Sequence, residues 1–79
     1  MPQNMRYYKA MVTYEVTKDE YDGQRFEQIL FCCSPQALPT SEQIRELFYS
    51  LEDLGKKYIG AHWHAVREDE IPTGEIHLL

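Results

Sequence analysis

Residues 6 to 17 alternate between two sets of side chains, which an extended strand would direct to opposite faces. One set is apolar and the other is mixed: Tyr8, Ala10, Val12, Tyr14 and Val16 against Tyr7, Lys9, Met11, Thr13 and Glu15. A period of two with aromatic and β-branched residues is typical of a half-buried strand. The pattern therefore predicts a first strand over residues 6–17.

A second strand is predicted from residue 25 to about residue 33. The polar segment 18–24 before it has no apolar face and contains Asp22-Gly23, a pair that tolerates positive φ, so we expect a hairpin loop there. Residues 29–33 (ILFCC) are continuously apolar, so alternation does not indicate which face is buried. Such a run fits a central strand, or an edge strand whose outer face is covered by a partner.

One amphipathic helix follows the second strand. Pro35 and Pro39 interrupt the strand, and Thr40 with Gln43 forms the pattern of a capping box. Apolar residues then recur at helical spacing, and they are Ile44, Leu47, Phe48, Leu51 and Leu54. Gly55 or Gly60 would end the helix.

The C-terminal third predicts another strand over residues 58–68. Its alternation places Ile59, Ala61, Trp63 and Ala65 on one face and His62, His64, Val66 and Glu68 on the other. Residues 69–74 are rich in turn-forming residues. Residues 75–79 either add a short edge strand, which we favour, or remain a loose tail, as residues 1–5 do.

Together these elements predict an α+β fold in a single domain spanning residues 1–79. The order is β-β-α-β, a small mixed sheet of three strands, or four if residues 75–79 join it, with one helix packed on one face. The strand order remains open. The order 1-2-3 suits the apolar second strand, whereas 2-1-3 places the alternating first strand in the middle.

The charge balance narrows the range of partners. The chain has 13 acidic and 8 basic residues and a formal net charge of −5. Nucleic acids and anionic membranes are bound largely through Lys and Arg, so neither is the expected partner. The N-terminus has no apolar run typical of a secretory signal, and no segment is long enough to cross a bilayer. Two adjacent cysteines, Cys32 and Cys33, then favour a cytoplasmic location with reduced thiols.

The sequence contains one candidate for a metal site, His62-x-His64. Two histidines at this spacing on a strand project from one face, as a divalent metal requires. A third ligand would come from Glu68, His77 or a cysteine. Paired Cys or Cys/His clusters typical of structural zinc sites are absent, and histidines on the solvent side of a strand are the commoner case. Cys32 or Cys33 beside one of these histidines would make a thiol site, but buried cysteines of an apolar strand are again commoner.

No known catalytic or cofactor motif is present, so we expect no enzyme activity and no cofactor. The glycines are isolated, so there is no phosphate-binding loop, and no G-x-S-x-G or H-E-x-x-H sequence occurs. The acidic clusters at residues 19–22 and 68–70 are expected at opposite ends of the sheet, too far apart to act as an acid–base pair.

We therefore expect function to depend on an exposed surface. One helix covers only one face of the sheet, so the other face would be available to a partner. The other face would carry either Phe26, Leu30 and Cys32 or Ile29, Phe31 and Cys33 from the second strand. Exposed apolar area with a polar rim is typical of interfaces. Alternatively, the C-terminal segment folds over this face and completes the core. The predicted partner-binding residues are Tyr7, Met11, Phe31, Tyr49, His62, His64 and Val66.

These features favour a small acidic protein–protein interaction module. In size, acidity and lack of catalytic motifs the chain is similar to the general class of small phage- or prophage-encoded inhibitors and regulators of host proteins. One alternative is a metal- or thiol-dependent site using His62, His64 and Cys32/Cys33. Another is a homodimeric structural subunit whose sheets pair across an edge.

Overall fold

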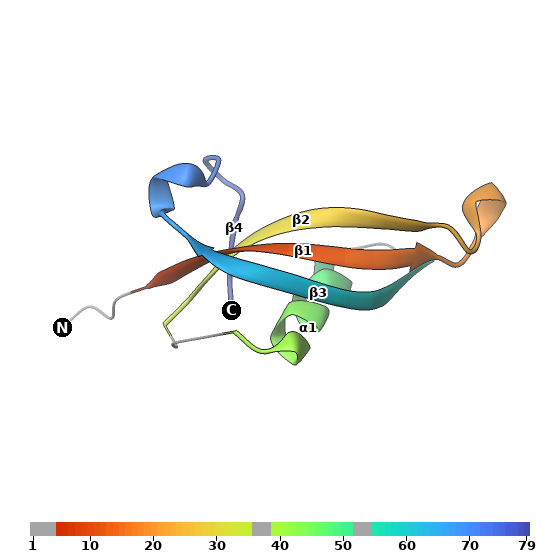
Figure 1. The fold of residues 1–79 in the computed structure, drawn as a ribbon, viewed down its shortest axis with the longest axis horizontal. Coiled ribbons are helices and arrows are strands. Elements are labelled where there is room, and N and C mark those ends of the chain that lie inside the picture. The colour runs from red at the N-terminus through yellow and green to blue at the C-terminus, as the bar shows by residue number, and fades with distance from the viewer. Residues whose placement is uncertain (1–4, 36–38, 52–54) are drawn as a thin grey trace.

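The computed structural model describes residues 5–35, 39–51 and 55–79, which form a four-stranded mixed sheet and one α-helix (Figure 1). The elements in chain order are β1 (Arg6–Val16), β2 (Arg25–Ser34), α1 (Ser41–Leu51), β3 (Lys56–Val66) and β4 (Ile76–Leu78), with short 3-10 turns at Asp19–Tyr21 and Glu68–Glu70. The predicted α+β class and β-β-α-β order are confirmed, and the C-terminal residues do add a fourth strand.

The first strand lies in the middle of the sheet, whose order is β3-β1-β2-β4. β1 pairs antiparallel with both β2 and β3, and β4 pairs parallel with the outer side of β2. Of the two orders left open, the structure therefore forms 2-1-3. β1 can be central and still alternate because α1 buries only one of its faces (Figure 1).

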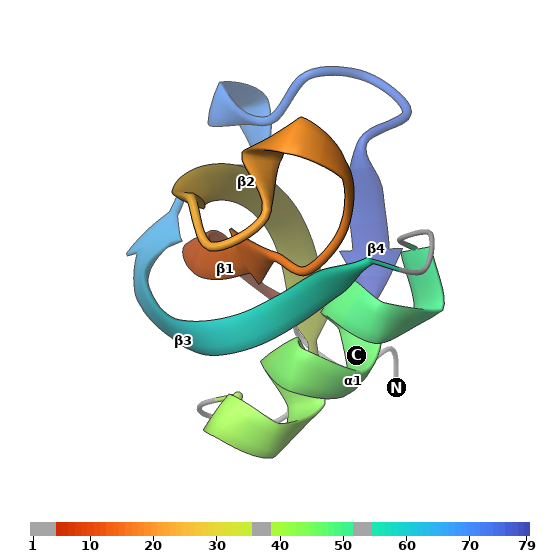
Figure 2. The same cartoon turned by 90° about the vertical axis from the view of Figure 1, so that its right-hand side faces the viewer.

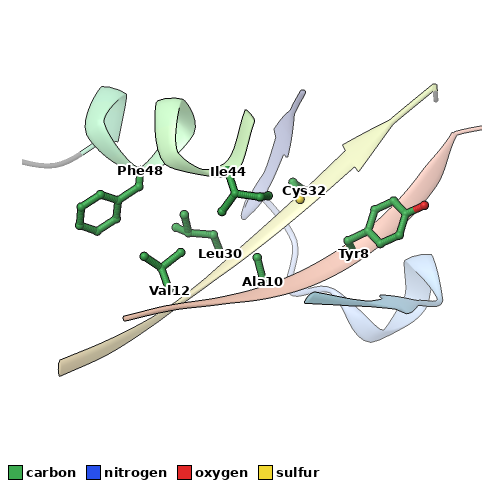
Figure 3. Close-up of a cluster of buried hydrophobic side chains, with 7 residues drawn as sticks. All are labelled: Tyr8, Ala10, Val12, Leu30, Cys32, Ile44 and Phe48. Carbon is green, nitrogen blue, oxygen red and sulfur yellow. The ribbon is translucent and has the colours of Figure 1, made fainter. Parts of the chain in front are cut away.

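The register divides the sheet into two faces. Ala10 lies opposite both Leu30 and Trp63, and this row belongs to the face that α1 covers, which we call the helix face. Ile44 and Phe48 of α1 point onto it (Figure 3). The buried cluster consists of Tyr8, Ala10, Val12, Leu30, Cys32, Ile44 and Phe48. We call the opposite face of the sheet the open face.

The start of α1 is a capping box, as predicted. The Gln43 backbone N–H donates to Thr40 Oγ1 at 3.2 Å, and the Thr40 N–H donates to Gln43 Oε1 at 2.9 Å. The predicted apolar stripe is only partly buried: Ile44 and Phe48 are fully buried, whereas Leu51 is 45% exposed. Leu54 lies outside the described residues.

Two glycines mark the ends of β-strands. Gly23 adopts φ +87° in the loop between β1 and β2, where the hairpin was expected. Gly55 adopts φ +102° directly before β3, which begins two residues earlier than predicted. Gly60 instead lies within β3, opposite Thr13, where a bulge shifts the register between Thr13 and Tyr14. A helix end at Gly60 is therefore wrong, because that residue is paired in the sheet.

Residues 67–75 connect β3, at one edge of the sheet, to β4 at the other. In the view along the sheet this segment passes over the side opposite α1 (Figure 2). Ile71, within it, is buried at 8% exposure. The open face is therefore crossed by chain at one end, beyond which the rest of the sheet extends (Figure 1).

Candidate functional site

Six of the seven residues predicted to bind a partner lie on the open face. The register places Met11 between Ile29 and His62, and Tyr7 between Cys33 and Val66. Between these two rows, Lys9 lies between Phe31 and His64. The choice left open for β2 is thereby decided: Ile29, Phe31 and Cys33 lie on the open face, because Met11, Lys9 and Tyr7 lie opposite them.

An apolar patch occupies the part of this face formed by β1, β2 and β4. Phe31 pairs with Ile76 of β4 on one side, and Met11 pairs with Ile29 across the β1–β2 hairpin. Ile29 is 45% exposed and Ile76 is 38% exposed, whereas Met11 and Phe31 are half-buried. We call Met11, Ile29, Phe31 and Ile76 the open-face patch. Ile76 was not predicted as a site residue, because its position depends on the parallel pairing of β4 with β2.

The other end of the open face is packed against the crossing segment. The Tyr7 hydroxyl donates a hydrogen bond to the Glu68 side chain, and burial together with the nearby Glu68 carboxylate raises the pKa of Tyr7. The alternative in which the C-terminal segment covers the open face is therefore correct for this end. It does not apply to Ile29, which stays exposed. Tyr7 is thus less available to a partner than Ile29.

Tyr49 is separated from the other predicted residues. It is 48% exposed, but it projects from α1 on the helix side of the sheet. Its hydroxyl accepts the backbone N–H of Tyr58 at 2.9 Å, and it lines a groove between α1 and the first half of β3 that also includes Glu46 and Ile59. Tyr49 therefore belongs to a different surface, because α1 packs against the opposite side of the sheet.

His62 and His64 are both exposed and lie beside Met11 and Lys9 of β1. The proposed third ligands lie elsewhere: Glu68 is beside Tyr7, and His77 is on β4 at the opposite edge of the sheet. Among the residues that the structure describes, no three His, Cys, Asp or Glu side chains gather as a metal site requires. Within its described residues, one copy of the chain therefore offers two adjacent imidazoles and no third ligand beside them.

Both cysteines are buried free thiols. Burial, and then the neighbouring Cys33, raises the pKa of Cys32 to about 11. The pKa of Cys33 is also raised, by burial and by the Glu68 carboxylate. Both shifts disfavour the thiolate, which is the reactive form. Cys32 also faces α1 whereas the histidines lie on the open face, so this geometry offers no Cys–His pair involving Cys32.

The two acidic clusters lie at opposite ends of the molecule, as expected. Residues 19–22 form the hairpin loop and Glu68–Glu70 forms the turn after β3 (Figure 1). At the hairpin end, the open face carries an ion pair between Arg25 Nε and Glu15 Oε1 at 3.4 Å. The open-face patch is thus bordered at both ends by charged side chains.

Compared with known proteins, the chain shows no significant match to a protein family, a curated protein or a solved structure. Within the described part of the chain, α1 has 11 residues, and no helix has the length and apolar character needed to cross a membrane. The open-face patch is the feature on which a functional proposal rests.

Proposed function

We propose that this protein is a small acidic binding module that docks on another protein through the open-face patch and thereby inhibits or regulates it. The observation that supports this proposal is the exposure of Ile29 and Ile76 on the sheet face that α1 does not cover. Contiguous apolar side chains with a charged border are typical of protein interfaces. Because the patch residues lie on or beside paired strands, their backbone is already ordered before binding, which reduces the entropy cost of forming the complex.

The charges predict the chemistry of the partner surface. The protein carries a net charge of −5, and Glu27 lies on the same strand as Ile29 while Glu75 directly precedes Ile76. A matching partner has an apolar centre bordered by Lys and Arg, so that the charges attract on approach and the apolar centres exclude water. Such an interaction weakens as salt is added.

Capture experiments with matched variants test this function. Tagged protein is incubated with host lysate, the retained protein is identified by mass spectrometry, and its dissociation constant is measured with purified components. Ile29→Lys and Ile76→Lys place a charge in the patch at exposed positions, where the fold tolerates it. We expect each to weaken binding by roughly tenfold or more, the effect of losing an interface centre.

Ser50→Lys is the control, because it adds the same charge to an exposed position on α1. Circular dichroism of all three variants checks that the fold is retained. Binding of the captured protein that survives both patch substitutions, or that Ser50→Lys weakens equally, would contradict the proposed surface.

A further inference from the structure

β3 is an 11-residue strand at the edge of the sheet, and among the strands of the described residues only β1 lies beside it. The first part of β3 has features by which proteins block edge pairing. It begins with two lysines, Lys56 and Lys57, and it contains a bulge near Gly60. In addition, the Tyr58 N–H already donates to the Tyr49 hydroxyl. Residues 60–66 (GAHWHAV) contain no charged residue and no proline. This stretch is suited to pairing with another strand.

We propose that two copies of this protein pair antiparallel through residues 60–66 of β3, about a two-fold axis at Trp63, and that the histidines assembled there bind a divalent transition metal. This proposal does not depend on the open-face patch. The two four-stranded sheets become one continuous sheet. Pairing through an edge is a common way to satisfy its free backbone groups.

The sequence around Trp63 is self-complementary in this register. A two-fold axis at Trp63 places Ala61 opposite the partner subunit's Ala65 and His62 opposite the partner subunit's His64. Ala65 and both histidines are exposed in the single copy. An isologous contact needs such a match, since each residue meets its symmetry-related counterpart.

Charge also favours pairing of β3 with itself. Lys56 and Lys57 begin the strand, and the acidic turn Glu68–Glu70 follows its end. In an antiparallel pair, the basic end of each strand lies near the acidic end of the other. Although each copy carries a net charge of −5, charges at this edge therefore attract.

The helix leaves this stretch accessible. The hydrogen bonds between α1 side chains and β3 lie at its first half, where Tyr49 and Ser41 reach Tyr58. The groove between the two elements involves Lys57, Tyr58 and Ile59 and no later residue of β3. The two helices of a dimer centred on Trp63 would therefore lie toward opposite ends of the shared edge.

The dimer brings together four imidazoles, whereas the described residues of one copy contain no group of three or more metal ligands. Directly opposed residues of antiparallel strands point to the same face, with Cβ atoms roughly 4.5–5.5 Å apart. Both copies would thus present His62 and His64 beside one another on the joined open faces. Imidazole nitrogen is a preferred ligand of Zn²⁺. We therefore expect Zn²⁺ to bridge the two copies and strengthen the dimer.

Sedimentation velocity of the purified protein over a range of concentrations, with Zn²⁺ or with EDTA, tests both parts. The double variants His62→Lys/His64→Lys and His62→Glu/His64→Glu alter exposed positions only, so each copy stays folded. We expect the parent to dimerise and each variant alone to be monomeric, because four like charges meet at the axis. An equimolar mixture of the two variants should dimerise, since Lys then faces Glu. Zn²⁺ should tighten the parent dimer by about tenfold or more, which is about 1.4 kcal/mol.

Ile29→Lys is the control that separates this dimer from the proposed function. Ile29 lies on β2, so its substitution should leave the β3 dimer intact while weakening capture of the partner. A parent protein that stays monomeric at all concentrations, or a dimer that the Lys/Lys variant retains, overturns the pairing. A variant mixture that remains monomeric overturns the register, and a dimer indifferent to Zn²⁺ overturns the metal site.

Discussion

Phe48 shows at the residue scale how this small core is filled. Its side chain has no exposed surface, and its ring centroid lies 5.7 Å from that of Tyr14 and 6.1 Å from that of Tyr58. Aromatic pairs at such separations add to the free energy of burial. One helical residue thereby links α1 to both β1 and β3. The neighbouring Leu47 is only half-buried, so Phe48 and Ile44 attach the helix.

Cys32 leads to a prediction about pH at the same scale. Its pKa is raised from 9.0 to about 11, so the folded state holds the neutral thiol while the unfolded chain ionises. Its contribution to the free energy of unfolding is therefore constant below pH 9 and is lost as the pH rises toward 11. Urea denaturation at several pH values between 9 and 11 should show this loss of unfolding free energy in the parent. The loss should be smaller in Cys32→Val, which has no thiol to ionise at this position.

The same thiol should react slowly with iodoacetamide in the native state. At a given pH near 8, a pKa two units higher leaves roughly a hundredfold less thiolate, and burial restricts access further. Rapid modification of native Cys32, followed by mass spectrometry, would contradict its placement on the helix face.

The capping box determines where α1 begins, at the element scale. The reciprocal bonds between Thr40 and Gln43 satisfy one backbone N–H of the first turn and fix the entry of the chain. Thr40→Ala removes the Oγ1 acceptor and should lower the free energy of unfolding by about 1 kcal/mol. Thr40→Ser keeps a hydroxyl acceptor, so in the same urea titration its free energy of unfolding should stay close to that of the parent. Equal losses in the two variants would show that packing of the threonine methyl matters more than the cap.

At the scale of the whole molecule, β4 and Leu79 attach the C-terminus to two parts of the fold. The Leu79 N–H donates to the Cys33 carbonyl at 2.9 Å, and the Leu79 side chain packs against the core cluster. Ile76 pairs with Phe31 on the open face. This short strand thereby protects the outer edge of β2 over residues 31–33.

Deletion of residues 76–79 should consequently affect more than the tail itself. We expect a lower midpoint of urea unfolding, because Leu79 leaves the core and the last residues of β2 become an open edge. Cys33 should also alkylate faster, since β4 no longer lies beside it. A truncated protein with the parent's midpoint and alkylation rate would show that β4 contributes nothing to the fold. Replacing Leu78 alone with Ser is the control, because its side chain is 70% exposed.

Much of the candidate site was predictable from the alternation of β1. Tyr7 and Met11 were assigned to the face opposite Tyr8, Ala10 and Val12, and the structure places them there. Tyr49 was also expected to be exposed, and it is, but on the surface beside α1. Spacing along a helix shows which residues leave its apolar stripe, but it does not show which surface of the protein they then reach.

The sequence by itself determined the elements whose signals are local: the alternation of β1, the turn at Gly23, and the capping box and apolar spacing of α1. These depend on side chains within a few residues of one another. Only the tertiary structure decided the strand order, the face on which Ile29 and Phe31 lie, and how far residues 67–75 cover it. The continuous run ILFCC contains no alternation from which a face can be read, and pairing between distant strands orients it. The edge position of β3 is likewise decided by pairing between distant strands, because β1 pairs with both β2 and β3 and so lies in the centre of the sheet.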